Sequence, residues 1–586
     1  MKRFLFVLTI LLVSSYELLA VNISYVLNME QPQTHYFDVE MKVEGLNKAY
    51  FDVKMPVWAP GSYLIREFAK NVEGFSVNDS KGNKIKHEKI DKNTWRIYAN
   101  KQNVSIKYKV YAFEISVRTS FLNDEHGYVN GTSVFMFVDG YINHPVELTI
   151  NPYKDWKKIS TALTKKGEYL YTAANYDDFV DCPIEIGNHV TFDFNASGVL
   201  HHVAMFGKGN YDIEKLKVDM AKVVTAATNV FGENPNKEYT FIIHNLKNGS
   251  GGLEHKSSTT LQVNRWTYEG NKYLGFLSLV AHEYFHLWNV KRIRPKALGP
   301  FDYNKENYTH LLWVMEGFTS YYDELLLLRA GFYNEDQFVG KEERNISSIE
   351  NQPGNKIQPV AMASFDAWIK AYRPNENSYN STISYYPKGH MLACLLDLEI
   401  IHATNYQKKL DDLLQYLYKE YYKKQNRGFT SAEFKKAVET IVGKNMDEFF
   451  DNYVYDTKTP DYKKYFGYVG IEVKTNPSDQ PSLGISISNN VIQSVVRNSS
   501  AYEGGLNVND ELIAINGYRV TDDNLSDVIE RYKVGDKLNV TVVREEYLKT
   551  YEITLKQSDY VSYSLVLKDT LNEHEKSGLI KWLSAQ

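Results

Sequence analysis

The sequence predicts a multidomain α+β protein, and three observations support this fold class. The chain has 586 residues, more than a single hydrophobic core accommodates, so roughly two to four domains are expected. Residues 21–195 show the two-residue alternation of β-strands, whereas residues 196–465 show mostly helical patterns. Strand patterns return over residues 466–557, and residues 558–586 form a tail whose pattern indicates no particular structure.

The N-terminus carries the pattern of an export signal, predicted over residues 1–20. Lys2 and Arg3 precede an apolar run over residues 4–13, and a cleavage position follows Ala20. The run is short for a membrane span, so a retained anchor is the less favoured alternative. The sequence therefore predicts an exported protein, periplasmic or secreted, with no stable membrane span after signal removal.

The first region after the signal is predicted to be an antiparallel β-sandwich. Apolar and charged or polar side chains alternate over residues 37–43 and again over residues 104–110, as in strands with one buried face. Turn signals such as Trp-Ala-Pro-Gly at residues 58–61 separate the runs. Short alternating strands with frequent turns are typical of sandwich folds.

The middle region combines strands with long helices. Strand patterns occur at residues 239–243 and 259–263. Helical patterns occur at residues 213–231, 273–290, 311–329 and 389–403. Strands followed by helices favour an α+β catalytic unit.

Composition narrows the range of partners and of redox chemistry. The 67 basic and 72 acidic residues give a net charge of −5, which argues against nucleic acid as the main partner. The content of 43% hydrophobic and 24% charged residues is typical of globular proteins. Cys182 and Cys394 are far apart in the sequence, so we expect two unpaired, buried thiols rather than a disulfide.

The most informative stretch is Ala-His-Glu-Tyr-Phe-His at residues 281–286. His282 and His286 are four residues apart, so on a helix both rings share a face and reach one metal ion. Glu283, directly after the first histidine, can act as a base on water at that metal. This H-E-x-x-H pattern is typical of zinc hydrolases and indicates peptide-bond hydrolysis. The alternative is a pair of ordinary surface histidines.

A zinc hydrolase also needs a third protein ligand. Asn289 and Arg292 stand where a metzincin has glycine and histidine, so that class is excluded. Glu316 lies in an apolar helical run, where an unpaired carboxylate is costly and a cation removes the cost. Asp323, two turns further along the same face, can accept the outer N–H of a ligand histidine. The alternatives are a salt-bridged Glu316 and a solvated Asp323.

Two longer motifs resemble those of a known family. One begins with the metal motif and continues as Leu-Trp-Asn-x-Lys-Arg-Ile-Arg-Pro to Pro295. The other is Trp-x-Pro-Gly-Ser-Tyr-Leu-Ile-Arg-Glu-Phe at residues 58–68. Both are similar to the glycyl aminopeptidase family of gluzincin metallopeptidases (metallopeptidase family 61), over nearly the whole mature chain. The resemblance implies a thermolysin-like catalytic domain, one zinc ion per chain, and removal of small N-terminal residues, such as glycine or alanine, from peptides.

The same resemblance assigns a substrate-binding stretch, Gly251-Gly252-Leu253-Glu254-His255. It is similar to the Gly-x-Met-Glu-Asn exopeptidase motif of related aminopeptidases. The resemblance implies that Glu254, with Gly251 and Gly252 beside it, binds the free α-ammonium group of the substrate. Leu253 and His255 depart from the motif, and a simple loop charge is the alternative role of Glu254.

Tyr386-Pro387-Lys388-Gly389 is similar to the Tyr-x-Lys-Gly element of the same relatives. The resemblance implies that the Tyr386 hydroxyl stabilises the tetrahedral oxyanion, where a donor opposite the metal lowers the barrier. A packed aromatic residue before a helix is the alternative, and Tyr385 is adjacent. In the motif after the metal helix, Arg292 and Arg294 either support the site or satisfy the helix end.

The third region resembles a PDZ domain. Ser-Leu-Gly-Ile-Ser-Ile at residues 482–487 is similar to a PDZ carboxylate-binding loop and its strand, and residues 500–517 resemble the PDZ core element. Such domains add a peptide as an extra strand and hold its carboxylate with loop N–H groups, here those of Leu483, Gly484 and Ile485. The module either captures protein C-termini or supports the catalytic region by packing.

These features predict an exported zinc aminopeptidase acting on peptides. His282, His286 and Glu316 hold zinc, and Glu283 moves the proton from water to the leaving amine. Tyr386 stabilises the oxyanion. Two alternatives remain open, a zinc endopeptidase and a peptide-binding or scaffold protein in which the PDZ domain matters most.

Overall fold

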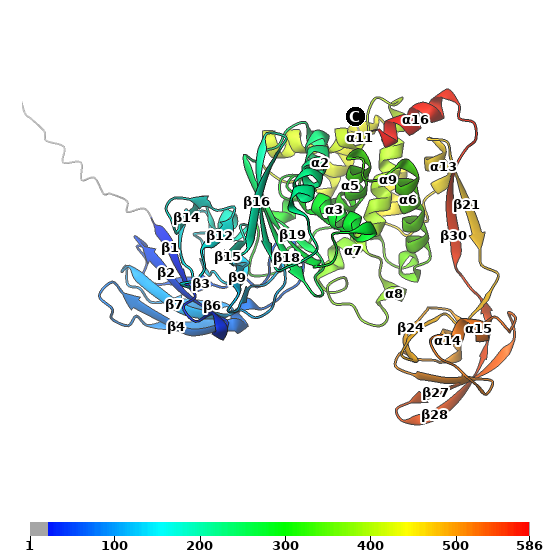
Figure 1. Ribbon diagram of the computed structural model, residues 1–586, viewed down its shortest axis with the longest axis horizontal. Coiled ribbons are helices and arrows are strands. Elements are labelled where there is room, and N and C mark those ends of the chain that lie inside the picture. The colour runs from blue at the N-terminus through cyan, green and yellow to red at the C-terminus, as the bar shows by residue number, and fades with distance from the viewer. Residues whose placement is uncertain (1–20, 585–586) are drawn as a thin grey trace, which may run out of the picture.

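A computed structural model describes residues 21–584 of the chain (Figure 1). The export signal expected at residues 1–20 lies outside the described residues. A β-rich N-terminal region, a largely helical middle region and a small β module follow one another, which confirms the predicted multidomain α+β class. None of the helices in residues 21–584 has the length and apolar character that a membrane crossing requires.

The N-terminal region is built around one seven-stranded sheet. In spatial order its strands are β13 (Thr164–Lys165), β14 (Leu170–Ala173), β11 (Val146–Asn151), β1 (Asn22–Asn28), β2 (Tyr36–Glu44), β7 (Val104–Tyr111) and β4 (Val72–Asp79). Side chains alternate between buried and exposed along β2 and β7, as the sequence predicts. The pairs are antiparallel except that β1 runs parallel to β11, so the sheet is mixed rather than purely antiparallel.

Two four-stranded sheets complete the N-terminal region around a shared apolar core. The first contains β10 (Phe137–Val138), β3 (Phe51–Lys54), β6 (Thr94–Ile97) and β5 (His87–Asp91). The second contains β12 (Lys158–Thr161), β15 (Ile184–Gly187), β9 (His126–Val129) and β8 (Phe121–Leu122). A short helix, α1 (Tyr176–Val180), precedes β15.

The middle region begins with a five-stranded sheet on which the helices pack (Figure 1). Its strands are β16 (Val190–Ala196), β17 (Val199–Phe206), β18 (Glu238–Leu246), β20 (Ser258–Asn264) and β19 (Gly252–Glu254). Four helices position the site described below: α3 (Gly270–Phe285), α4 (Leu312–Met315), α5 (Gly317–Arg329) and α9 (Tyr385–Ala403). The other helices are α2 (Ile213–Phe231), α6 (Glu335–Glu350), α7 (Val360–Phe365), α8 (Ser378–Ser381), α10 (Leu410–Leu417), α11 (Ser431–Val442), α12 (Asp447–Phe449) and α13 (Tyr462–Gly467).

The helices follow the sequence pattern with instructive differences. Helix α2 spans the expected residues because Asp212 caps its start and Gly232, with φ 73°, ends it. Helix α3 ends at Phe285 rather than at the expected residue 290. Leu287 and Trp288 extend the apolar pattern beyond the helix, because they are buried in the core although the helix has ended. Cys182 and Cys394 are free and buried, as expected.

A two-stranded ribbon connects the C-terminal module to the middle region, and the module has its own apolar core (Figure 1). The ribbon pairs β21 (Ile471–Pro477) with β30 (Val561–Leu567). The module contains β22 (Pro481–Ser482), β23 (Ile485–Ser488), β24 (Val491–Val495), α14 (Ser500–Gly504), β25 (Glu511–Ile515), β26 (Tyr518–Arg519), α15 (Leu525–Ile529), β27 (Lys537–Arg544), β28 (Tyr547–Thr554) and β29 (Lys556–Gln557). The tail after the ribbon forms α16 (Glu573–Leu583), which the sequence analysis did not predict.

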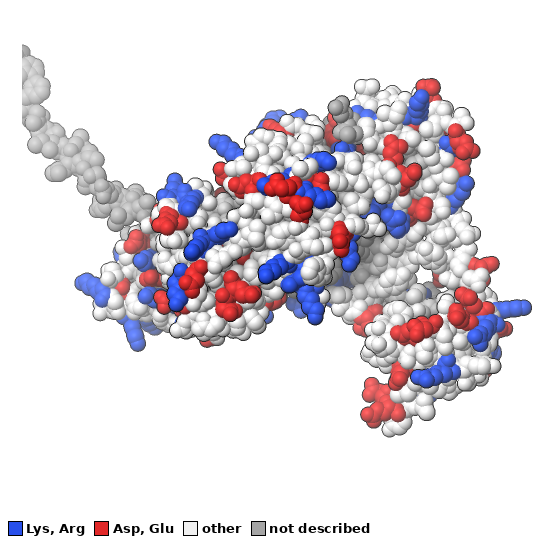
Figure 2. All heavy atoms as spheres, in the orientation of Figure 1, with Lys and Arg blue, Asp and Glu red and all other residues white. Residues whose placement is uncertain are grey.

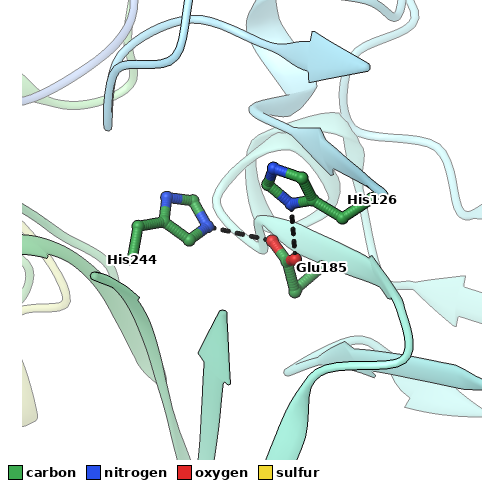
Figure 3. Close-up of side chains that lie close together, drawn as sticks. All are labelled: His126, Glu185 and His244. Carbon is green, nitrogen blue, oxygen red and sulfur yellow. Dashed lines mark hydrogen bonds and ion pairs between the residues drawn. The ribbon is translucent and has the colours of Figure 1, made fainter. Parts of the chain in front are cut away.

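A buried polar cluster joins the N-terminal region to the middle region (Figure 3). His126 on β9 and His244 on β18 each place a ring nitrogen 2.8 and 2.9 Å, respectively, from the two carboxylate oxygens of Glu185 on β15. Burial alone would raise the pKa of Glu185, but attraction to His126 and His244 lowers it to about 2. Hydrogen bonds to the Glu185 carboxylate thus link the two sheets.

Candidate active site

Two histidines of α3 point toward one position. His282 lies in the last turn of the helix, and His286 caps it with dihedral angles that are still helical (φ −61°, ψ −19°). The rings therefore share one helix face, and their Nε2 atoms lie 3.2 Å apart. Zinc–nitrogen bonds of about 2.0–2.1 Å at a tetrahedral angle place two nitrogens about 3.4 Å apart. The ring positions fit a shared zinc ion.

The third donor, Glu316, comes from the junction between α4 and α5. It is 2% exposed, and its Oε2 lies 3.6 Å from Nε2 of His282 and 3.3 Å from Nε2 of His286. Burial alone would raise the pKa of Glu316, but attraction to His286 and His282 lowers it to about 2. An ionised carboxylate therefore faces both rings, and this set of two imidazoles and one carboxylate matches the ligands of catalytic zinc.

The outer nitrogens of both rings are held by acceptors. Nδ1 of His282 lies 2.8 Å from Oδ2 of Asp323, and the other oxygen of Asp323, Oδ1, accepts a hydrogen bond from the Ser278 hydroxyl. Nδ1 of His286 lies 2.7 Å from the backbone oxygen of Asn289. Asp323 and the Asn289 carbonyl accept the Nδ1 protons of the two rings, so Nε2 is the nitrogen that each ring directs toward the shared position and would offer to a metal.

Asn289 is a site residue whose role the sequence did not predict. Its side-chain Nδ2 donates to the backbone oxygens of Val314 and Met315 at 3.0 and 3.1 Å. Asn289 thus orients His286 through its own carbonyl and holds the end of α4 just before Glu316 through its side chain. Its place in the longer motif after the metal helix was the available signal.

Glu283 follows the first ligand histidine on α3. It is 5% exposed, and its Oε2 has no hydrogen-bond partner among the described residues. Burial raises the pKa of Glu283 to about 7, against the opposing effect of His282 and His286. A buried carboxylate with an uncommitted oxygen beside the metal ligands has the properties of a general base.

The edge strand β19 carries Glu254 to the same place. Glu254 is 5% exposed, and its carboxylate lies within 4.8 Å of ligand atoms of Glu283 and His286. Gly251 precedes the strand with φ 99°, in the left-handed region that favours glycine. A Cβ atom on Gly252 would overlap the Glu283 carboxylate. The two glycines therefore let the strand pass directly beside Glu283.

Tyr386 lies in the first turn of α9, not before the helix. Ser384 caps this helix, and its side chain accepts a hydrogen bond from the backbone N–H of Tyr386. The Tyr386 ring stacks on the His282 ring with centroids 6.2 Å apart, whereas Tyr385 is fully buried. Burial and the charge of Glu316 raise the pKa of Tyr386 well above its usual value. The hydroxyl therefore keeps its proton and can donate to an oxyanion.

Arg292 and Arg294 contact the turns that follow α3. Arg292 donates to the backbone oxygen of Leu287 at 2.6 Å and to the side chain of Asn236 at 2.9 Å. Arg294 donates to the backbone oxygen of Leu298 at 3.1 Å. These contacts favour the expected alternative in which both arginines satisfy the chain after the helix.

The residues expected to hold a peptide C-terminus lie apart from this site, in the C-terminal module. Leu483 belongs to the module's core, Gly484 has φ 70°, and Ile485 begins β23. Strand β23 is the outermost strand of its sheet, so one of its edges has no strand partner in the described chain. A peptide strand can pair along such an edge.

The fold and the site together define a metallopeptidase of the H-E-x-x-H type, and comparison with known proteins specifies its family. Family models match residues 24–188 (Peptidase M61 N-terminal domain), 275–392 (M61 glycyl aminopeptidase) and 467–555 (PDZ domain). The crystal structure of an aminopeptidase N family protein from Idiomarina loihiensis is 30% identical, with a TM-score of 0.89, over 96% of this chain and 100% of that chain. The chain belongs to the M61 glycyl aminopeptidase family and is an enzyme, which confirms the resemblance, the PDZ domain included.

Other solved structures are more distant. The M1 zinc metallopeptidase from Deinococcus radiodurans is 12% identical, with a TM-score of 0.48, over 75% of this chain and 95% of that chain. Native yeast LTA4 hydrolase is 11% identical, with a TM-score of 0.47, over 75% of this chain and 68% of that chain. Among curated proteins, none matches the sequence.

Proposed function

We propose that this protein is an exported zinc aminopeptidase that removes small N-terminal residues, of the glycine or alanine type, from peptides. The observation that carries the proposal is that three metal-binding side chains and one further carboxylate lie together. The Nε2 atoms of His282 and His286 and the carboxylate of Glu316 share one position, and Glu254 lies directly beside them. The three side chains fit a metal ion, and Glu254 offers a carboxylate to the amine of a substrate.

One zinc ion per chain is proposed at the three ligands. Bound there, zinc polarises the scissile carbonyl and acidifies a water molecule. Glu283 accepts the proton of the attacking water on its free Oε2 and returns it to the leaving amine. Tyr386 donates its hydroxyl hydrogen to the oxyanion that develops on the scissile carbonyl.

Glu254 is proposed to set the point of cleavage. Its carboxylate pairs with the α-ammonium group of the substrate, so the first peptide bond falls at the metal ligands. The alternative, an endopeptidase, needs no free amine. Peptides with free and with acetylated N-termini separate the two, because an aminopeptidase cleaves only the free peptide.

The decisive experiment is a panel of aminoacyl reporter substrates measured with and without a chelator. We expect glycyl and alanyl reporters to be cleaved fastest, and all cleavage to stop on chelation and return with zinc. Cleavage that survives complete metal removal would contradict the proposal. Fractionation of producing cells and sequencing of the mature N-terminus would test export and the cut after Ala20.

We further propose that the C-terminal module binds protein C-termini along β23. The free edge of this strand and the left-handed Gly484 before it support the assignment. Titration of the full chain with peptides that end in a free or an amidated carboxyl group tests it. Equal binding of both forms would contradict carboxylate recognition by the loop.

A further inference from the structure

The motif at residues 58–68 begins with a tight turn, whose residues Ala59 and Ser62 are buried. The backbone N–H of Ser62 donates to the oxygen of Ala59 at 3.0 Å. Pro60 occupies the second position of this turn, and Gly61 the third with φ 87°. These are the residues and the dihedral angle that a type II turn requires. We call residues 59–62 the Gly61 turn.

The Gly61 turn packs directly against the carboxylate of Glu254. A Cβ atom built on Gly61 would lie 2.6 and 2.7 Å from the two carboxylate oxygens of Glu254 and 2.7 Å from Cδ1 of Leu253. These separations are too short for non-bonded atoms, so the carboxylate occupies the volume that any side chain at position 61 would need. Glycine is required here for packing as well as for its positive φ.

The turn is immobilised by the catalytic region on both sides. Trp58 donates its indole N–H to the backbone oxygen of Asp302 at 2.8 Å and packs edge-on against Trp368, with ring centroids 5.1 Å apart. Tyr63 packs against the same Trp368 at 5.6 Å. The hydroxyl of Tyr372 lies 3.4 Å from the backbone oxygen of Gly61. The turn is therefore fixed relative to Glu254.

We propose that the Gly61 turn positions the Glu254 carboxylate and closes the site beyond the α-ammonium group. The N-terminal region thereby takes part in choosing substrates, because its turn occupies the space into which a residue preceding the α-amine would extend. Gly61 is a positioning residue that acts through Glu254. The inference rests on the proposed binding of the α-ammonium by Glu254.

The primary test compares Gly61→Ala with Gly82→Ala. Gly82 has φ 85° and nothing within 4 Å of its Cβ position, so the control carries the same backbone strain without the contact. The readout is the ratio of inhibition by glycine hydroxamate to inhibition by its N-acetyl form, since both chelate the metal and only one has a free amine. We expect Gly61→Ala to reduce this ratio about 10- to 100-fold, the range of a lost charge-assisted contact, and Gly82→Ala to leave it unchanged.

An unchanged ratio in folded Gly61→Ala would overturn the inference, because a general weakening of the site affects both inhibitors equally. If Gly61→Ala does not fold, Tyr372→Phe removes the contact to the backbone oxygen of Gly61 without adding volume. We expect it to lower the same ratio about two- to fivefold, as loss of one weak hydrogen bond does. An unchanged ratio in this variant would also overturn the inference.

A double-mutant cycle with Glu254→Gln separates this inference from the proposed function. If Gly61 acts through Glu254, adding Gly61→Ala to Glu254→Gln lowers the inhibitor ratio much less than it does in the wild type. A normal ratio in Glu254→Gln would contradict the proposed role of Glu254 itself. A reduced ratio in Glu254→Gln together with additive effects would contradict only the role of the turn.

Discussion

At the scale of single residues, the arrangement assigns separate tasks to neighbouring carboxylates. Glu283 and Glu316 are both buried, yet the pKa of Glu283 is raised to about 7 by burial, whereas attraction to His286 and His282 overcomes burial at Glu316 and lowers its pKa to about 2. The carboxylate with the higher pKa suits proton transfer near neutral pH, and the other suits metal binding.

Replacing Glu283 with Gln removes the proposed base and keeps its shape. We expect kcat to fall about 10²- to 10⁴-fold, the usual contribution of general acid–base catalysis, with the zinc content unchanged. Steady-state kinetics on a glycyl reporter and metal analysis measure the two quantities. The control is Glu335→Gln, an exposed residue in the first turn of α6. Activity within a few-fold of the wild type in Glu283→Gln would refute the assignment.

Asp323 is expected to influence metal affinity rather than the chemical step. Asp323→Asn weakens the acceptor that fixes Nδ1 of His282, and such outer contacts contribute about 10- to 100-fold in affinity. Competition with a chelator of known affinity gives the zinc dissociation constant. Asp336→Asn, on an exposed position of α6, serves as control. An unchanged constant in Asp323→Asn would show that the ring needs no such support.

The sequence predicted much of this site because its main signal is local. Helical geometry alone places His282 and His286 together, and an apolar run makes Glu316 conspicuous. The supporting roles of Asn289 and Gly61 depend on contacts with segments distant in the chain. Both residues lie in the two family-like motifs, but no spacing rule encodes their contacts, so the folded chain is needed to show what they touch.

At the scale of elements, the interface between the β15-containing sheet and the β18-containing sheet depends on a buried carboxylate. Glu185→Gln keeps the shape and removes the charge from both hydrogen bonds of the polar cluster (Figure 3). We expect a loss of roughly 2–4 kcal/mol in the free energy of unfolding, measured by urea titration at neutral pH. The matched control is Glu552→Gln, whose partner Lys537 is exposed, so no measurable loss of stability is expected there.

The contribution of Glu185 to the free energy of unfolding is expected to decrease as the pH falls. Its pKa is lowered from 4.5 in the unfolded chain to about 2 in the folded protein. The ionised group therefore stabilises the fold above about pH 4.5, and this stabilisation is lost as the pH falls toward 2. The difference in unfolding free energy between wild type and Glu185→Gln is expected to shrink over that interval. A difference that grows on acidification would contradict the assigned charge state.

Some helices and strands differ from those that the sequence pattern predicted. The helical pattern at residues 273–290 continues past the end of α3 because core packing, not helix geometry, buries Leu287 and Trp288. The parallel pair of β1 and β11 was missed because strand patterns do not reveal strand direction. Helix α16 was missed because only two of its large apolar residues are buried, Trp582 and Leu583.

At the scale of the whole molecule, charged groups of both signs are interspersed on the face shown in Figure 2, in accord with the net charge of −5. The C-terminal module contacts the catalytic region next to the segment that carries Tyr386. Asn380 on α8 donates to the backbone oxygen of Val495 and accepts from the backbone N–H of Arg497, both at 2.8 Å.

Asn380→Ala removes both of these contacts and is expected to loosen the module. Loss of two hydrogen bonds lowers the local stability, so we expect about 10-fold faster amide hydrogen exchange in β24. Hydrogen-exchange mass spectrometry of the full chain would detect this change. Ser381→Ala, one residue further along α8, is the control because its hydroxyl donates to the backbone oxygen of Asn377 within the same segment. Equal exchange in the two variants would show that Asn380 does not secure the module.

The ribbon of β21 and β30 brings the entry and the exit of the C-terminal module side by side, with Pro477 opposite Val561. The chain then returns to the catalytic core, where Trp582 is fully buried and donates to the hydroxyl of Tyr321 at 2.9 Å. The module is therefore an insertion within the peptidase, not an appendage at its end. A short hairpin spliced between Pro477 and Val561 would excise it cleanly, whereas truncation of the chain before the module would also strip a tryptophan from the enzyme's interior.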